Sequence, residues 1–143
     1  MEGRQGVDPA TLDRVGAEVA ALAAAVDAVA RPVVCHRDLH PDNLLVDGDG
    51  RLVAVLDWDM AEAWDPAGEW FKLDDWLFPR LPDVAGPLAA RYRAVHGELP
   101  RWEERVRLVH LVEGLNAVAN AAAEPDRAYE DERRARLAAV LAG

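Results

Sequence analysis

The sequence predicts a mainly α-helical protein of the α+β class, with one small β-hairpin between two helical regions. Apolar residues recur at three- and four-residue steps before and after a central segment, which is the pattern of amphipathic helices. Within the central segment, two β-type runs flank Asp47-Gly48-Asp49-Gly50, a sequence suited to a tight turn. Because the chain has 143 residues and 51% of them are hydrophobic, we expect residues 1–143 to form a single domain with a buried core.

Residues 8–30 are expected to form a leading helix. Asp8 suits the N-cap, and Pro9 suits the first turn, where its missing N–H has no helical partner to lose. The residue before a proline avoids the helical region, so Arg31-Pro32 ends the helix. One continuous apolar stripe follows the helix for about six turns, formed by Leu12, Val15, Val19, Leu22, Val26 and Val29.

Residues 33–59 are expected to contain the hairpin and the polar loop that precedes it. Val33–Cys35 is a short β-type run, and the polar stretch His36–Asn43 follows it. Leu44–Val46 and Leu52–Leu56 are then two strands, and the glycines between them permit the positive φ angles of a tight turn.

Residues 66–143 are expected to form a helical subdomain. Prolines and glycines divide its apolar periodicity into separate segments. The pattern predicts four helices: one beginning near Glu69, one marked by Leu88, Tyr92 and Val95 and stopped by Gly97 and Pro100, one from Trp102 to just before Pro125, and one over about Tyr129–Leu141.

Composition excludes several classes of partner and compartment. Sixteen basic and twenty-six acidic residues give a net charge of −10 without a basic patch, so we expect no nucleic-acid partner. Cys35 is the single cysteine, which excludes an intramolecular disulfide and fits a reducing compartment. The most apolar run, Val19–Ala30, is too short for a membrane span and contains Asp27. Acidic residues also interrupt the amino-terminal stretch where a secretory signal would be apolar, so we expect a cytoplasmic protein.

The polar stretch after the first β-type run carries the residues with the clearest chemical meaning. His36, Asp38 and Asn43 follow the pattern H-x-D-x-x-x-x-N, and Asp57 follows the second strand of the hairpin. Phosphoryl transfer needs an acceptor hydroxyl whose proton is accepted, and Mg²⁺ held against the phosphates. A loop carboxylate can accept the proton, while an amide oxygen and a second carboxylate supply the hard ligands that Mg²⁺ prefers. We therefore expect the hairpin to return Asp57 to the end at which Asn43 lies, with Asp38 facing the same cleft.

The segment Val34–Val46 resembles the catalytic loop of the aminoglycoside phosphotransferase family, which has the protein-kinase-like fold. Leu56-Asp57-Trp58-Asp59 resembles the metal-binding segment of that family, the counterpart of Asp-Phe-Gly in protein kinases. The resemblance implies the C-terminal lobe of that fold and a phosphotransferase that uses ATP and Mg²⁺. The acceptor would be the hydroxyl of a small molecule, such as an aminoglycoside or a similar metabolite. Asp38 would then be the catalytic base, and Asn43 and Asp57 would bind Mg²⁺.

A downstream pattern bears on the same resemblance. Asp65-Pro66 followed by Glu69 is similar to the family's Gly-Asp-Pro-x-x-Asp, in which the last acid braces the catalytic loop. Trp64 and Glu69 stand where the family has glycine and aspartate, and Arg37 replaces a glycine that many members have. We expect His36, His40 and Glu69 to organise the loop, and Asp59 and Asp65 to contact substrate or the water around the metal.

The sequence before the loop lacks features of the other lobe of this fold. No glycine-rich loop precedes His36, and the single lysine, Lys72, lies downstream of the loop. Because an N-terminal lobe normally supplies the phosphate-covering loop and the phosphate-pairing lysine, we expect that lobe to be absent. The chain alone would then bind ATP weakly, and it would act as a homodimer or with a separate N-lobe protein. A non-catalytic, kinase-derived binding or scaffold module is the alternative.

Three features have a second interpretation. His36 and His40 with Asp38 suggest a metallohydrolase site, which Pro41 disfavours because it prevents a helical His-x-x-x-His face. Four tryptophans could stack on a flat ligand, but their six-residue spacing favours packing: Trp58, Trp64, Trp70 and Trp76. Five acids could attract a cationic acceptor such as an aminosugar, or simply be solvated: Glu62, Asp65, Glu69, Asp74 and Asp75.

Overall fold

The computed structural model describes residues 6–29 and 31–143 and divides into two compact units. One unit comprises the chain up to Asp27 together with Glu103–Gly143, and the other comprises Ala28–Trp102. The described chain is mainly helical, as the sequence predicts, but it contains two small antiparallel sheets where one hairpin was expected. No helix among the described residues has both the length and the apolar character needed to cross a membrane.

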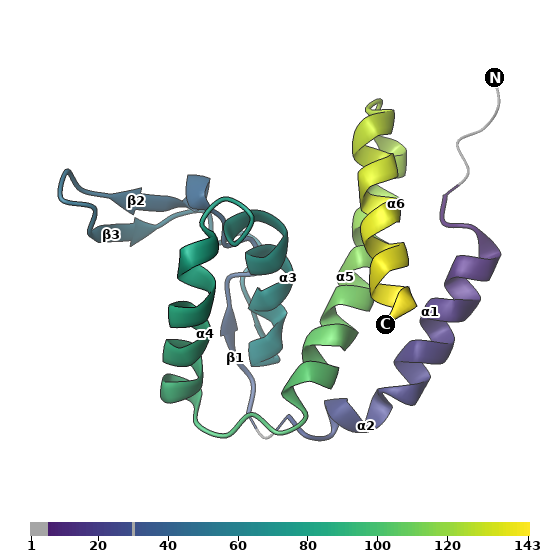
Figure 1. The fold of residues 1–143 in the computed structure, drawn as a ribbon, viewed down its shortest axis with the longest axis horizontal. Coiled ribbons are helices and arrows are strands. Elements are labelled where there is room, and N and C mark those ends of the chain that lie inside the picture. Colours follow the sequence, from purple (N-terminus) through teal and green to yellow (C-terminus); the bar gives the residue numbers. More distant parts are fainter. Residues whose placement is uncertain (1–5, 30) are drawn as a thin grey trace. The chain divides into compact units, whose positions relative to one another are not determined.

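The first unit is entirely helical. It contains α1 (Pro9–Ala21), α2 (Ala23–Val26), nearly all of α5 (Trp102–Ala123) and α6 (Arg127–Ala142), shown in Figure 1. Asp8 caps α1 as predicted, because its side chain accepts a hydrogen bond from the backbone N–H of Thr11 at 2.9 Å. The buried core contains Val15 from α1, residues of α5 and residues of α6, namely Leu111, Val118, Leu137 and Leu141.

The leading helix differs from the expected continuous helix over residues 8–30. Leu22, with φ −92° and ψ 2°, separates α1 from α2, and helical structure ends at Val26. After this interruption Ala25 is fully buried, whereas Val26 is 53% exposed. The predicted stripe is therefore wrong at its end: a break of one residue redirects the chain without disturbing the apolar spacing in the sequence.

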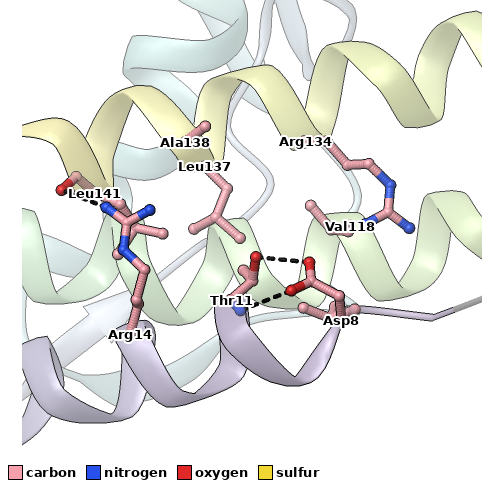
Figure 2. Close-up of a pocket in the computed structure, with 9 residues that line it drawn as sticks. Asp8, Thr11, Arg14, Val118, Arg134, Leu137, Ala138 and Leu141 are labelled. Carbon is pink, nitrogen blue, oxygen red and sulfur yellow. Dashed lines mark hydrogen bonds between the residues drawn. The ribbon is translucent and has the colours of Figure 1, made fainter.

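A cavity of about 210 Å³ lies between α1 and the α5–α6 pair within this unit. Figure 2 shows its lining, with Val118, Leu137 and Leu141 forming the apolar side. The polar groups at its rim are used by the fold itself, since Arg14 donates to the carbonyl of Leu141 at 3.3 Å. The cavity is therefore a packing gap beside the core, with an internally satisfied rim.

The second unit contains the predicted hairpin. Strands β2 (Leu44–Val46) and β3 (Leu52–Val55) pair antiparallel with Leu44 opposite Val55, and a bulge follows Leu45. The turn uses Gly50 at φ 77°, and the Asp47 carboxylate accepts backbone hydrogen bonds from Asp49 and Arg51, each at 2.9 Å. In Figure 1 the hairpin extends away from α3 and α4 of the same unit.

A second strand pair was not expected from the sequence. Strand β1 (Val33–Cys35) pairs antiparallel with β4 (Glu62–Trp64), with Val33 opposite Trp64 and Cys35 opposite Glu62. The stretch from Asp57 to Asp75 is rich in acids and tryptophan, and we expected it to pass from loop directly into a helix near Glu69. The pairing closes the chain around the polar loop and the hairpin that lie between these strands.

Helical segments complete the second unit. A 3₁₀ turn (Pro66–Glu69) leads into α3 (Trp70–Lys72), a π-helical turn (Leu73–Leu77) and then α4 (Pro82–His96). Trp70 packs edge-to-face on Tyr92 and Trp102, with ring centroids 4.8 Å and 4.9 Å away. The Tyr92 hydroxyl also donates to the carbonyl of Pro66 at 2.7 Å. This aromatic cluster fixes the helical turn on which Glu69 lies.

Candidate functional site

The polar loop begins at His36, immediately after β1, and His36 connects it to the end of β3. The residue is 3% exposed, and its ring Nε2 donates to the carbonyl of Leu56 at 2.8 Å. Its Nδ1 accepts the backbone N–H of Asp38 at 3.3 Å. Since both ring nitrogens bond to backbone, this histidine shapes the loop and has no free nitrogen for a metal.

Glu69 holds the same loop from the helical side. The residue is 8% exposed, and its carboxylate accepts the backbone N–H groups of His36 and Arg37, the latter at 3.3 Å. The backbone at Arg37 has φ 66°, in the left-handed region that glycine adopts without strain. The longer glutamate therefore makes the loop contacts expected of the family's aspartate, at a turn where glycine is the usual residue.

The two positions that depart from the family's glycines contact each other. The guanidinium carbon of Arg37 lies 4.4 Å from the ring centroid of Trp64, and Arg37 also pairs with Glu62. Both partners are on β4, the unexpected strand. The stacking and the ion pair offset the backbone strain at Arg37. The two residues that replace the family's glycines, Arg37 and Trp64, therefore stabilise each other.

Gly68 is required by the contact between Arg37 and Trp64. A Cβ at this position would lie 2.5 Å from Cε3 of Trp64, and that indole is in turn held by Arg37. We expect Gly68→Ala to lower the free energy of unfolding by about 1–3 kcal/mol, because the ring cannot retreat without losing the cation above it. Urea denaturation measures the effect. Gly48→Ala is the matched control, because nothing lies within 4 Å of its added Cβ. It should change the free energy of unfolding by less than about 0.5 kcal/mol. Equal losses of stability in the two variants would contradict the proposed clash with Trp64.

The Asp38 carboxylate lies among donors from two elements. Lys72 Nζ of α3 is 2.8 Å from Oδ1, while Asn43 Nδ2 and His40 Nε2 are 3.4 Å and 3.5 Å from Oδ2. Burial of this carboxyl raises its pKa, but the hydrogen bond and the positive charge of Lys72 outweigh that effect. The pKa of Asp38 is therefore below its ordinary value, and the group is ionised at neutral pH.

Asn43 is fixed on the same loop with its amide oxygen unused. Its Nδ2 donates to the carbonyl of Asp38 at 2.9 Å and lies 3.2 Å from His40 Nε2. Among the described residues, Oδ1 has no hydrogen-bond partner. An oriented amide oxygen of this kind is a suitable ligand for a hard divalent cation.

The hairpin register sets where Asp57 lies. The N–H of Leu56 donates to the carbonyl of Asn43 at 2.8 Å, so the next residue, Asp57, leaves β3 at the end where β2 begins. Asp57 is exposed and has φ 58°, a conformation that aspartate tolerates better than most residues. Its carboxylate and the Asn43 oxygen are hard-oxygen donors that suit Mg²⁺, which usually takes one or two protein ligands besides phosphate and water.

Other candidates have simpler surroundings. Asp65 caps the 3₁₀ turn by accepting the N–H of Ala67 at 2.8 Å, and its carbonyl accepts the Cys35 thiol at 3.2 Å. Burial and then the charge of Glu69 raise the pKa of Cys35 to about 12, so the thiol stays protonated. Asp59 is exposed after the end of the hairpin.

The alternative of a metallohydrolase is not supported. Among the described residues, no group of three or more His, Cys, Asp or Glu side chains is arranged to hold a metal ion. His36 is committed to backbone, and His40 Nδ1 has no hydrogen-bond partner in the part of the chain that the structure describes, although Asp42 lies 3.5 Å away. The tryptophans differ in exposure: Trp70 is buried, as expected for a packing role, whereas Trp58 is 51% exposed.

Lys72 is the functional candidate that sequence reasoning missed. In the sequence, Lys72 follows the polar loop, whereas the phosphate-pairing lysine of this fold precedes it. Its contact with Asp38 forms only when the chain folds. Its spacing of three residues from Glu69 is the one signal that could have found it. Residues three apart on a helix share a face, so a brace on the loop implies that Lys72 points the same way.

Comparisons with known proteins bear on the fold and the family of the chain. A solved structure described as the GDP complex of wild-type aminoglycoside 2'-phosphotransferase-IIIa is similar in fold, with a TM-score of 0.63 and 21% sequence identity. The similarity covers 95% of this chain and 45% of that protein, so the chain spans less than half of its length. No curated protein sequence matches the chain. The sequence model of the phosphotransferase enzyme family (APH) matches residues 2–105, most of the chain, and the chain therefore belongs to that family.

Proposed function

We propose that the chain is the C-terminal lobe of a small-molecule kinase, which transfers the γ-phosphoryl group of ATP to a hydroxyl of its acceptor. The observation that carries this proposal is the set of contacts around Asp38. The carboxylate is on a loop braced by Glu69, it is hydrogen-bonded by Asn43, and its pKa is lowered. A positioned, ionised carboxylate beside an unused amide oxygen suits an acceptor hydroxyl and a metal–phosphate group.

The reaction follows from these positions. The acceptor hydroxyl donates a hydrogen bond to the Asp38 carboxylate, which takes its proton as the oxygen attacks the γ-phosphorus. The new oxygen–phosphorus bond forms as the bond to the β-phosphate oxygen breaks, and the leaving diphosphate carries away the electron pair. Asn43 and Asp57 would hold Mg²⁺, which supplies charge neutralisation at the phosphates. His36 and Glu69 keep the loop in shape through their backbone contacts.

The chemical class of the acceptor follows from charge. The chain has a net charge of −10, which favours a cationic acceptor such as an aminosugar or another amino alcohol. Within the site region, however, Glu62 pairs with Arg37, and Asp65 and Glu69 accept backbone hydrogen bonds. These three acids are occupied by the fold, so Asp59, exposed after the hairpin, is the better candidate to meet an acceptor amine.

Phosphate transfer by the full chain tests the proposal. We expect acceptor-dependent release of ADP when ATP and Mg²⁺ are supplied at millimolar concentration with a panel of aminosugars and amino alcohols. Mass spectrometry of the acceptor should show one added phosphate. GTP is tested in parallel, because the structural relative was solved with GDP. If neither nucleotide gives acceptor-dependent turnover, the proposal is contradicted and the non-catalytic scaffold is favoured.

We further propose that the lobe works with a partner, either a second copy or a separate nucleotide-binding lobe. The hairpin exposes large apolar side chains, with Leu45, Val46, Leu52 and Val53 between 48% and 60% exposed. Several large apolar side chains exposed on one short hairpin favour an interface with another protein surface. Light scattering is expected to show a dimer or larger species, and calorimetry to show weak ATP binding. A monomer with micromolar ATP affinity would contradict the expected need for a partner.

A further inference from the structure

Lys72 is unusual in composition and in place. It is the single lysine among sixteen basic residues, and it lies against the carboxylate of the proposed base, with Nζ 2.8 Å from Asp38 Oδ1. Arginine is the better residue for a purely structural ion pair, because its fork binds a carboxylate with two hydrogen bonds. The cation that contacts the candidate base is therefore a lysine, whose compact and mobile ammonium differs from the guanidinium of the other fifteen basic residues.

The local helix explains how Lys72 reaches the loop. Glu69 and Lys72 are three residues apart and both contact the polar loop, Glu69 through the backbone of His36 and Lys72 through Asp38. Directly after Lys72 the helix changes to a π-helical turn over Leu73–Leu77. Such π-turns are rare and occur frequently at functional sites.

Stability alone does not account for this pair. The Lys72 side chain is 28% exposed and the Asp38 side chain 26% exposed, and partly exposed ion pairs contribute little to folding. The Lys72 ammonium also lies 5.8 Å from the ring centroid of Trp76, so one side of it faces an aromatic surface. Among the described residues, Asp38 is the ion-pair partner of this ammonium, at 2.8 Å.

We propose that Lys72 is a catalytic residue whose ammonium contacts the transferring phosphoryl group, and this inference rests on the function proposed above. An acceptor oxygen must lie about 2.6–3.2 Å from the base, and the phosphorus about 3–3.5 Å from that oxygen. An ammonium 2.8 Å from the same carboxylate is then within reach of the phosphoryl oxygens.

The electrostatic benefit grows during the reaction. As the acceptor proton passes to Asp38, the carboxylate loses its negative charge and its attraction for Lys72 weakens. The same ammonium is then available to the phosphoryl oxygens, while Lys72 itself neither gains nor loses a proton. A fixed positive charge beside a transferring phosphoryl group stabilises the transition state more than the ground state.

Arg80 provides a matched control. Its guanidinium lies over the same Trp76 ring at 5.1 Å, but its ion pair is with Asp42 at 3.6 Å. Arg80 and Lys72 are thus two cations on one aromatic surface, and the Lys72 pair is the one that reaches Asp38. Removing the positive charge at Lys72 and, separately, at Arg80 distinguishes a general electrostatic effect of a nearby cation from direct contact with the phosphoryl group.

The first measurement compares kinetic constants. We expect Lys72→Met to lower kcat by about 10²–10³, the usual loss when one transition-state donor is removed, with KM for the acceptor unchanged. Lys72→Arg should recover part of the rate, and Arg80→Met should stay within about twofold of wild type. Unchanged kcat in folded Lys72→Met, checked by its Tm, would overturn the proposal.

The second measurement does not depend on turnover. An acyl-phosphate derivative of ATP, acylated on its γ-phosphate, transfers its acyl group to a nearby amine. The amine attacks the carbonyl, an amide forms, ATP leaves with the electron pair, and the amine proton passes to solvent. We expect the full wild-type chain to be acylated at Lys72, excess ATP and Mg²⁺ to prevent this, and Lys72→Arg to remain unlabelled there.

The two measurements separate the two proposals. Competed labelling of Lys72 in a chain that transfers no phosphate would support the phosphoryl contact and contradict the proposed function. Active chain without competed labelling of Lys72 would overturn the contact and leave the proposed function standing. Labelling that excess ATP does not reduce is random acylation and also overturns the contact.

Discussion

Asp38→Ala is expected to lower kcat by about 10²–10⁴, the usual contribution of a positioned general base. The wild-type carboxylate is held ionised by Lys72 and oriented by Asn43, and alanine provides neither a proton acceptor nor a partner for them. Since the base acts on the acceptor proton in the transition state, KM for nucleotide should change little. Initial rates at saturating acceptor and nucleotide measure the effect.

Two further variants make this result specific. Asp38→Asn keeps the shape of the side chain without its charge and should lose about as much activity as alanine. Asp42→Asn removes an exposed acid from the same loop, one that pairs with Arg80, and should retain wild-type kcat. Wild-type kcat in both Asp38 variants would remove this residue from the mechanism, whatever the behaviour of Asp42→Asn.

Local chemistry in the sequence was sufficient to predict the polar loop and the hairpin. The signals that predict them act between residues close in sequence: the His-x-Asp pattern, the asparagine five residues after the aspartate, and the glycines of the turn. Strands β2 and β3 and the turn at Gly50 match the prediction. The α5 and α6 helices likewise follow their apolar periodicity and proline or glycine ends, whereas α4 ends before Gly97 as predicted but begins at Pro82 and contains Pro87, ahead of its predicted apolar positions.

Features that depend on distant partners could not be predicted in this way. Strand β4 has no intrinsic strand signal and forms because Glu62, Ala63 and Trp64 meet β1 from 27 or more residues away. The pairing then gives Arg37 its two partners, which is why an arginine can occupy a glycine-like backbone conformation. A reading of Arg37 in isolation shows a departure from a family pattern and no reason for it.

The site shows the same division between local and distant information. Glu69 was expected to brace the loop from its position in a motif, and its carboxylate does contact the backbone of His36 and Arg37. Lys72 belongs to no motif, so its approach to Asp38 emerges only when the helical turn is packed on the loop. Contacts between residues far apart in the sequence, such as this one, become visible only in the folded structure.

Asp57→Ala is expected to abolish metal-dependent turnover. The residue leaves β3 where Asn43 enters β2, and its carboxylate is the only negative charge in the proposed ligand pair, since Asn43 supplies a neutral oxygen. Removing that charge would leave Mg²⁺ with the neutral Asn43 oxygen, phosphate and water, which hold it too weakly to keep the phosphates in a fixed position relative to Asp38. Titration of the rate with Mg²⁺ measures the loss.

The backbone at Asp57 requires a second substitution to make the result interpretable. At φ 58°, alanine costs about 1 kcal/mol or more, whereas asparagine tolerates this region as aspartate does. Asp57→Asn should therefore keep the wild-type Tm while still losing metal-dependent turnover, which separates loss of a ligand from loss of the hairpin end. Asp49→Ala, at the turn of the same hairpin, should retain both activity and its Mg²⁺ dependence, because its side chain is at the opposite end from Asn43. A wild-type Mg²⁺ dependence in Asp57→Asn would exclude this carboxylate as a metal ligand and leave Asn43 without its proposed partner.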